Sequence, residues 1–273
     1  MHDLLFTNLD GTLFRASLHA DDDVPLEYIN GKPRSFVSKR IWDFFTADHL
    51  KIDQALDGRP RTYIIPITSR DLNQYCRLLM DPLANRGAGA RFRMTHALIA
   101  NGAILLNYSS GITVDIEWYT QSMGLANPYA VALQKIYQAV NRTYDDTVAC
   151  STCVYPFFLS IQLRSKHPDH TAALQEFLKE QAALYEIHYC DCRSKVYLIP
   201  PPFTKKMAIR RYIQRFPDNH QKLIAAGNSC IDFSMQSEVD QFIKVDSSIY
   251  AEPFHDVLCQ VFPDSWKEWQ QKE

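Results

Sequence analysis

The fold is indicated most clearly by one stretch near the start of the chain, Leu4-Leu5-Phe6-Thr7-Asn8-Leu9-Asp10-Gly11-Thr12-Leu13. A short apolar run becomes polar, reaches a glycine and then turns apolar again. This pattern predicts a buried parallel strand whose carboxyl end opens into a loop. Because ligands of open α/β sheets bind in the crevice at that end of the strands, Asn8 and Asp10 are candidate site residues.

A second stretch repeats the arrangement of an apolar strand that ends in polar residues. Residues 63–67 predict a buried strand, and Thr68, Ser69 and Arg70 follow it directly. A hydroxyl group at a strand end, just ahead of a helix that starts near Asp71, is well placed to hold a phosphate. The tripeptide is equally compatible with a plain strand end and helix cap, so its meaning depends on its place after the first stretch.

Two further candidate sets lie in the last third of the chain. Residues 200–202 are three prolines, and a predicted helix follows them at Lys205 and Lys206. An apolar strand then ends in Gly-Asn-Ser at Asn228, and Asp232 stands one turn later. No Gly-x-Gly-x-x-Gly follows any predicted strand, so the pattern does not favour a dinucleotide-binding fold.

In this order, the four stretches resemble the motifs of the haloacid dehalogenase-like (HAD) phosphatases. The first resembles Asp-x-Asp-Gly-Thr-Leu and the last resembles Gly-Asp-Ser-x-x-Asp-x-x-Met, with Asn8 and Asn228 in place of the first aspartate of each. Asn101-Gly102-Ala103, a strong hairpin signal between two apolar runs, is similar to an element of the sucrose-phosphate phosphatase and phosphomannomutase branch. Lys206 stands where the family usually has glycine.

The resemblance implies an α/β fold, with a Rossmann-like doubly wound parallel sheet as its core and an inserted α+β cap domain. Residues 1–106 and 200–273 are expected to form the core, and residues 107–199 the cap. The spacing of apolar residues predicts a strand over 112–119, helices over 128–140 and 170–184, and strands over 157–163, 187–192 and 195–199. Residues 14–34 look like an irregular flap over the strand ends.

The resemblance also implies a role for each candidate residue. In the family the residue at Asn8 is the nucleophile, and Asp10 is the general acid and base. Phosphate-binding positions are Thr68, Ser69, Arg70 and Lys205. The Mg²⁺ site implied by the family would involve Asn8, Asp10, Asn228 and Asp232. An amide oxygen can ligate a hard cation but brings no charge, and a carboxamide is a poor nucleophile, so we expect the magnesium site to be weak or absent.

We therefore expect a HAD-fold protein that binds a small phosphorylated or anionic metabolite, with a sugar phosphate favoured, and whose phosphatase activity is lost or much reduced. An active or redirected Mg²⁺-dependent hydrolase is the first alternative. A regulatory or structural partner subunit is the second, so a protein partner stays open. The sequence is compatible with natural divergence and with introduced substitutions at Asn8 and Asn228.

Composition sets wider bounds. The 273 residues are 46% hydrophobic and 22% charged, with a net charge of -2, which gives no footprint for nucleic acid or an anionic membrane. No apolar run approaches the roughly 20 residues that cross a bilayer. Met1-His2-Asp3 has no basic region typical of a signal peptide, so we expect a cytoplasmic protein.

Seven cysteines in a chain of this length are expected to be reduced thiols. Cys150 and Cys153 nevertheless have metal-ligand spacing, and His188, Cys190 and Cys192 alternate along one predicted strand. These residues predict either a zinc site in the cap or small, buried cap residues with a surface histidine.

Overall fold

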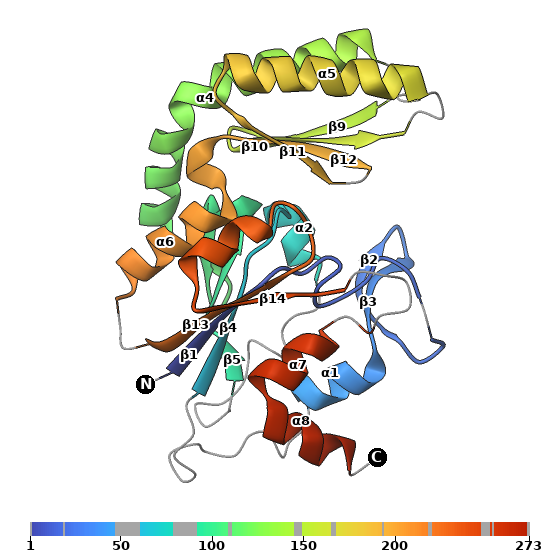
Figure 1. Cartoon of the computed structure of the whole chain (residues 1–273), viewed down its shortest axis with the longest axis vertical. Coiled ribbons are helices and arrows are strands. Elements are labelled where there is room, and N and C mark those ends of the chain that lie inside the picture. Colours follow the sequence, from blue (N-terminus) through green and yellow to red (C-terminus); the bar gives the residue numbers. More distant parts are fainter. Residues whose placement is uncertain are drawn as a thin grey trace.

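The structure is a computed structural model of the chain. It describes residues 2–18, 20–46, 61–78, 92–108, 111–144, 149–164, 168–192, 194–217, 220–246, 252 and 254–271. Two units are visible in Figure 1: a parallel sheet with its helices, and an antiparallel sheet covered by two long helices.

A five-stranded parallel sheet forms the centre of the first unit, in the order β14-β13-β1-β4-β5. Its strands are β1 (His2–Thr7), β4 (Arg61–Pro66), β5 (Phe92–Met94), β13 (His220–Gly227) and β14 (Gln241–Lys244). The expected α/β fold with a Rossmann-like parallel sheet is therefore present. Pro66 is tolerated because its pairing with β5 ends at Ile64, two residues earlier, so no ladder bond is lost on that side.

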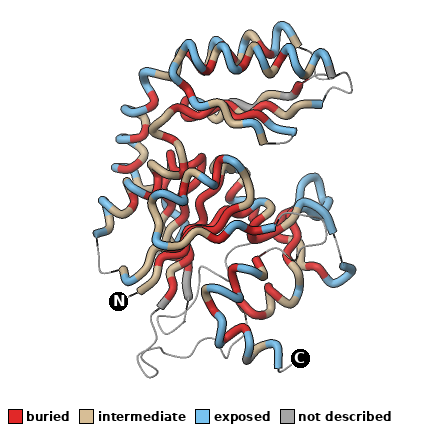
Figure 2. Tube along the Cα trace, in the orientation of Figure 1, coloured by how far each residue is buried: buried red, intermediate tan, exposed pale blue. Residues whose placement is uncertain are grey.

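Both faces of this sheet are covered, which explains why its strands are continuous apolar runs. Leu5 and Ile224 face α1 (Lys39–Thr46), α7 (His255–Val261) and α8 (Pro263–Gln270). Phe6 and Ala225 face the opposite side, where α6 (Lys205–Arg215) packs. Figure 2 shows buried residues running along the whole sheet.

The antiparallel unit consists of a four-stranded sheet and two helices. Its sheet order is β11-β12-β10-β9. The elements are α4 (Ile116–Thr143), β9 (Ala149–Val154), β10 (Phe158–Leu163), α5 (Pro168–Leu184), β11 (His188–Cys192) and β12 (Lys195–Ile199). Apolar side chains of α4 and α5, such as Leu133 and Leu178, pack on one face of the sheet. Figure 1 shows the other face turned toward the end of the parallel sheet where β1 and β4 finish.

Two small sheets complete the described structure. The Asn-Gly signal is confirmed as a hairpin: β6 (His96–Ile99) pairs antiparallel with β7 (Ile104–Asn107), across the short helix η3 (Ala100–Gly102). β8 (Thr113–Val114) extends it. Residues expected to form an irregular flap instead contain a second hairpin, β2 (Val24–Ile29) with β3 (Lys32–Val37).

The strand predicted over residues 112–119 is present only as β8, at Thr113–Val114, because α4 begins at Ile116. Asp115 caps the helix by accepting a hydrogen bond from the Trp118 backbone N–H at 2.9 Å. Of the alternating apolar residues, Ile112 and Ile116 are exposed and only Trp118 is buried, so the alternation does not mark a buried face. None of the described helices is long and apolar enough to cross a membrane.

Candidate functional site

Four loops meet where the parallel strands end, and they bring the predicted site residues together. The backbone N–H of Asn8 bonds to Ala226 O at 2.9 Å, so the loops after β1 and β13 lie side by side. Thr68 N–H bonds to Leu98 O at 2.9 Å, which ties the loop after β4 to the β6–β7 hairpin. These main-chain hydrogen bonds hold the loops together independently of their side chains.

The two asparagines are bonded directly to each other. Asn8 Nδ2 donates to Asn228 Oδ1 at 3.1 Å and to the Asp10 backbone oxygen at 2.9 Å. Thr12 Oγ1 lies 3.3 Å from the same nitrogen and donates to Asn228 Oδ1 at 3.1 Å. The NH₂ group of Asn8 is thus surrounded by oxygen atoms, and Asn228 is held by both Asn8 and Thr12.

Lys205 determines which way the Asn8 amide faces. Its Nζ donates to Asn8 Oδ1 at 2.9 Å and to Asp232 Oδ1 at 2.5 Å, and the side chain is only 1% exposed. Since an ammonium group can only donate, the oxygen of Asn8 must face Lys205 and the NH₂ group must face the other oxygens.

Asp232 links this lysine to the loop after β13. Its second oxygen, Oδ2, accepts hydrogen bonds from the backbone N–H of Asn228 at 3.1 Å, and from the N–H and hydroxyl of Ser229 at 2.9 and 2.6 Å. The approach is close, because a Cβ on Gly227 would lie 2.3 Å from Asp232 Cβ. Asp232 is therefore buried but fully partnered, and it positions Lys205.

Arg70 is the centre of a second cluster, toward solvent. Its guanidinium pairs bidentately with Asp10, at 2.9 and 2.8 Å, and reaches Glu27 at 3.0 Å. Burial alone would raise the pKa of Glu27, but hydrogen bonds from Arg77, Arg70 and Ser35 outweigh it and hold that pKa below its usual value. Burial would lower the pKa of Arg70, and the bonds to Asp10 and Glu27 raise it instead.

The hydroxyl groups after β4 are less available than the resemblance implies. Thr68 is fully buried, and its Oγ1 accepts from the Arg70 backbone N–H at 3.2 Å. Ser69 hydrogen-bonds Tyr197, which reaches over from β12 of the antiparallel unit. The predicted phosphate-binding residues are thus gathered at one place, with Thr68, Arg70 and Lys205 already engaged in bonds within the protein.

The donor set does not fit a magnesium ion. The oxygens that the family pattern would aim at the cation surround the NH₂ group of Asn8, which fills the place of a positive partner. Asp10 is paired with Arg70 and Asp232 with Lys205, so neither carboxylate is uncompensated. Among the described residues, no group of three or more His, Cys, Asp or Glu could hold a metal ion.

Sequence reasoning missed the contribution of the β2–β3 hairpin. Glu27 and Ser35 are buried there and bind Arg70, and Ser35 donates to Glu27 at 2.9 Å. The only available signal was an acidic residue in an apolar stretch, Leu26-Glu27. Thr12, in the first stretch, is hydrogen-bonded to the side chains of both asparagines.

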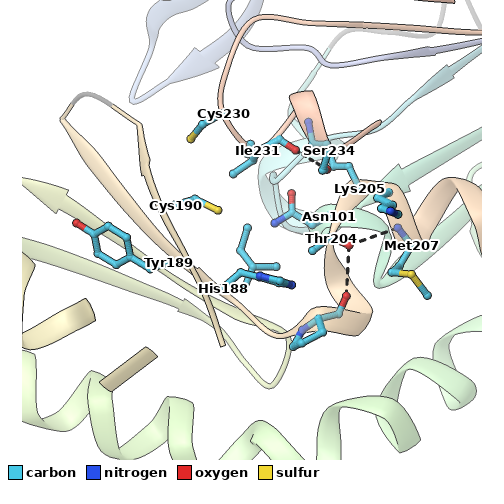
Figure 3. A pocket seen from close by; sticks show the side chains of 13 residues that line it. Asn101, His188, Tyr189, Cys190, Thr204, Lys205, Met207, Cys230, Ile231 and Ser234 are labelled. Carbon is cyan, nitrogen blue, oxygen red and sulfur yellow. Dashed lines mark hydrogen bonds between the residues drawn. The ribbon is translucent and has the colours of Figure 1, made fainter. Parts of the chain in front are cut away.

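A cavity of about 400 Å³ lies beside the network, between the two units. Figure 3 shows the first turn of α6 on one side and strand β11 on the other. Side chains on its wall include Asn101, His188, Cys190, Thr204, Lys206 and Ile231.

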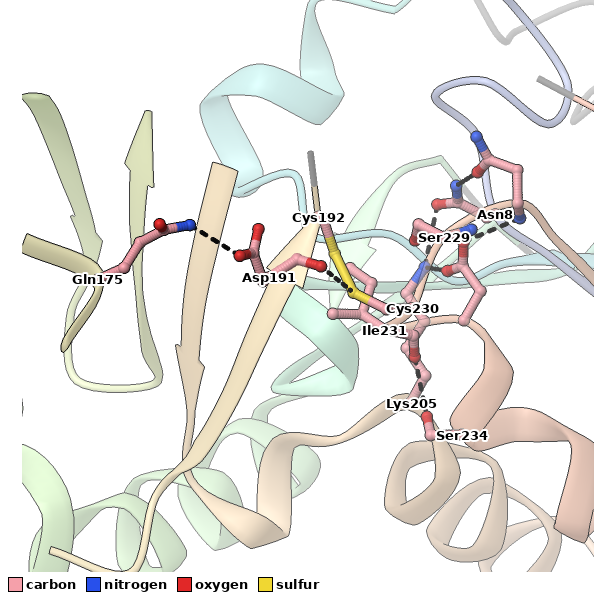
Figure 4. The surroundings of a disulfide bond; sticks show 11 residues. Asn8, Gln175, Asp191, Cys192, Lys205, Ser229, Cys230, Ile231 and Ser234 are labelled. Carbon is pink, nitrogen blue, oxygen red and sulfur yellow. Dashed lines mark hydrogen bonds and ion pairs between the residues drawn. A yellow bond between two sulfur atoms is a disulfide. The ribbon is translucent and has the colours of Figure 1, made fainter. Parts of the chain in front are cut away.

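Two cysteines form a disulfide bond, so the expectation that all are reduced is wrong. Cys192, in β11, is bonded to Cys230, two residues after Asn228 (Figure 4). Cys192 therefore cannot be a zinc ligand, while Cys190 is a free thiol whose pKa is raised by burial. The side chains of Cys150 and Cys153 lie outside the described residues.

No family model matches the chain, and no curated protein matches it. Among solved structures, the sucrose-phosphatase of Synechocystis sp. PCC6803, in complex with sucrose and phosphate, matches with a TM-score of 0.53 and 18% identity, over 91% of this chain and 84% of that one. A trehalose-6-phosphate phosphatase related protein matches with a TM-score of 0.53 and 17% identity, over 99% and 100% of the two chains.

An N-terminally truncated IMP-nucleotidase of Plasmodium falciparum, bound to IMP, matches with a TM-score of 0.53 and 12% identity, over 99% of this chain and 68% of that one. Likeness at these identities shows the fold alone. By its parallel sheet, its strand order and these neighbours, the chain has the fold of the HAD-like phosphatases.

Proposed function

We propose that this protein binds a small phosphorylated or anionic metabolite without a metal ion, and that it lacks the phosphatase activity typical of the HAD fold. The observation that carries the proposal is the hydrogen bond from Asn8 Nδ2 to Asn228 Oδ1, with Lys205 on the opposite side of the same amide. A carboxamide in that position is a poor nucleophile toward phosphorus, and its NH₂ group fills the place of a cation.

Charge balance supports a site that works without a metal. Arg70, Arg77 and Lys205 are matched by Asp10, Glu27 and Asp232 in ion pairs. Two aspartates in place of Asn8 and Asn228 would add two negative charges, which a divalent cation would neutralise. Two asparagines without a cation leave the same net charge, so an anion meets no additional repulsion here.

The antiparallel unit is suited to cover such a ligand. We propose that residues 107–199 act as a cap on a core formed by residues 1–106 and 200–273. Tyr197 and Cys192 already reach the loops at the strand ends, by a hydrogen bond to Ser69 and by the disulfide to Cys230. A cap of this kind excludes water and selects ligands by shape.

The test is a paired assay of the protein and its Asn8→Asp/Asn228→Asp variant, with Mg²⁺ and a panel of sugar phosphates. We expect turnover by the double variant only, and binding of the same compounds by the unmodified protein in EDTA. Turnover by the unmodified protein at the rate of the variant would show an active enzyme. If neither protein turns over or binds any compound, the alternative of a partner subunit is favoured.

A further inference from the structure

A buried carboxamide on the cavity wall, that of Asn101, has no hydrogen-bond partner within the described part of the chain. Its nitrogen and its oxygen are both buried, and neither is hydrogen-bonded to any of the residues that the structure describes. In Figure 3 this carboxamide faces the cavity, between Thr204 and Ile231. A buried polar group without a hydrogen bond is unfavourable, so a ligand that bonds to this carboxamide relieves that cost when it binds.

The backbone around Asn101 is held firmly in an uncommon conformation. Ala100, Asn101 and Gly102 all have positive φ, at 49°, 55° and 86°. Asn101 N–H bonds to Thr68 O, and Ala100 N–H bonds to Arg70 O, both at 2.8 Å. The carboxamide is therefore presented to the cavity by a loop that is held in place by the backbone oxygens of Thr68 and Arg70.

The first turn of α6 forms the neighbouring wall and adds free donors. Thr204 caps the helix, its hydroxyl accepting from Met207 N–H and its carbonyl from Ala208 N–H. The backbone N–H groups of Lys205 and Lys206, at the first two helical positions, have no partner inside the helix. They lie at the positive end of the helix dipole, where an anion is stabilised.

Side-chain charge adds to this field. Lys206 lies 3.6 Å from Glu238, but Arg210 already holds that carboxylate with two hydrogen bonds, at 2.8 and 3.1 Å. Lys205 is balanced by Asp232. One positive charge, on Lys206, is thus left over beside the cavity.

We propose that the anionic group of the ligand, a phosphate or a carboxylate, binds at the first turn of α6, held by the carboxamide of Asn101 and the N–H groups of Lys205 and Lys206. This inference rests on the proposed function and moves its anion away from the strand ends. There Lys205 Nζ is enclosed by Asn8 and Asp232, and Arg70 is paired with Asp10 and Glu27. The apolar wall, Ile199, Pro201, Met207 and Ile231, accommodates the body of the ligand.

Calorimetric titration in EDTA tests the assignment, with inorganic phosphate and trehalose 6-phosphate as probes. Asn101→Gly keeps the positive φ and removes the carboxamide, and Asn101→Asp keeps the shape and adds a negative charge. We expect roughly a tenfold weaker Kd for Asn101→Gly, which loses one hydrogen bond to a charged group. We expect a loss of similar size for Lys206→Met, which keeps the backbone N–H but removes the unbalanced positive charge, and no measurable binding for Asn101→Asp. Lys135→Met, which removes an exposed lysine on α4, is the matched control and should bind as the unmodified protein does.

The outcomes separate the two proposals. If a probe binds and only Thr68→Val or Arg70→Met weakens it, the anion lies at the strand ends: this inference is overturned and the proposed function stands. If the unmodified protein binds neither probe, both proposals are overturned. Thermal unfolding of each variant without ligand shows that a loss of binding is not a loss of fold.

Discussion

The carboxamides of Asn8 and Asn228, 220 residues apart in the chain, are joined by a hydrogen bond of 3.1 Å at the carboxyl end of the parallel sheet. Aspartates at both positions would instead face each other with like charges. The neutral pair therefore makes this part of the site stable without a cation.

The double variant Asn8→Asp/Asn228→Asp should depend on a cation for its stability. In EDTA we expect the free energy of unfolding to fall by about 3 kcal/mol, since two carboxylates would then meet the Asp10 carbonyl without a counter-ion. For a chain of this size that is a decrease in Tm on the order of 10 °C. Calorimetry should show Mg²⁺ restoring most of the loss, while the unmodified protein does not respond.

Asn8→Asp alone is the control for this experiment. Its new carboxylate still has Lys205 on one side, and Asn228 can turn its amide to donate on the other. We expect a smaller loss of stability and little effect of Mg²⁺. An unmodified protein that Mg²⁺ stabilises as strongly as the double variant would contradict the metal-free site.

Removing Lys205 should destabilise the fold through its partner. Lys205→Met leaves Asp232 buried with its charge uncompensated, at a cost of about 3–5 kcal/mol. Lys205→Met/Asp232→Asn should recover part of that loss, because no buried charge remains. Urea unfolding of the two single variants and the double variant gives the coupling energy, and additive losses would show that the ion pair is not coupled.

The Glu27 cluster makes stability fall on acidification. Its pKa is lower in the folded protein than its ordinary value of 4.5, so its contribution is fully present above that value and is lost as the pH falls through the folded pKa. We expect Glu27→Gln to lose about 1–3 kcal/mol at pH 7, because hydrogen bonds to a buried charge are replaced by weaker ones. Urea unfolding at several pH values should show the difference between the two proteins shrinking as the pH falls below 4.5 and through the folded pKa of Glu27; a constant difference would be inconsistent with this.

The disulfide should stabilise the protein by linking the two units. Cys192 and Cys230 are 38 residues apart, and closing a loop of that length restricts the unfolded chain by about 4 kcal/mol in the chain-entropy model. Cys192→Ser, or reduction of the unmodified protein, should therefore lower the urea midpoint to a similar value. Cys76→Ser removes an exposed free thiol and is the control. Equal midpoints with and without reductant would mean that the bond contributes nothing.

Gly31 and Gly102 both have positive φ, and substituting each by alanine measures backbone strain separately from steric crowding. Gly31→Ala adds a Cβ with no atom within 4 Å, so only the left-handed backbone is penalised, by about 1 kcal/mol. At Gly102 the same Cβ would lie 2.1 Å from Ala208 Cβ, and overpacking adds roughly 1–3 kcal/mol more. Thermal unfolding should rank Gly102→Ala well below Gly31→Ala, and similar Tm values would show that α6 can shift to make room.

The sequence predicted the elements that local pattern controls. Apolar runs that end in Asn8, Thr68 and Asn228 predicted three strands of the parallel sheet. This succeeded because both the burial of a strand and the turn that follows it depend on residues that are adjacent in the chain. The Asn-Gly hairpin at Asn101 was recognised for the same reason. Local pattern was less reliable at residues 112–119, where alternation predicted one long strand but the strand stops at Val114 and the Asp115 cap begins a helix.

By itself, the sequence predicted the three strands and the helix that carry Asn8, Thr68, Asn228 and Lys205. Through its resemblance to the family motifs, it also predicted that amides stand at two positions where the family has carboxylates. Only the tertiary structure decided that Glu27 and Ser35 hold Arg70, that Cys192 meets Cys230, and that the Asn101 carboxamide faces a cavity without a partner. These relations join residues that are distant in the chain. The packing of the sheets and helices decides which of these residues meet, and that packing cannot be predicted from the spacing of residues within one stretch of sequence.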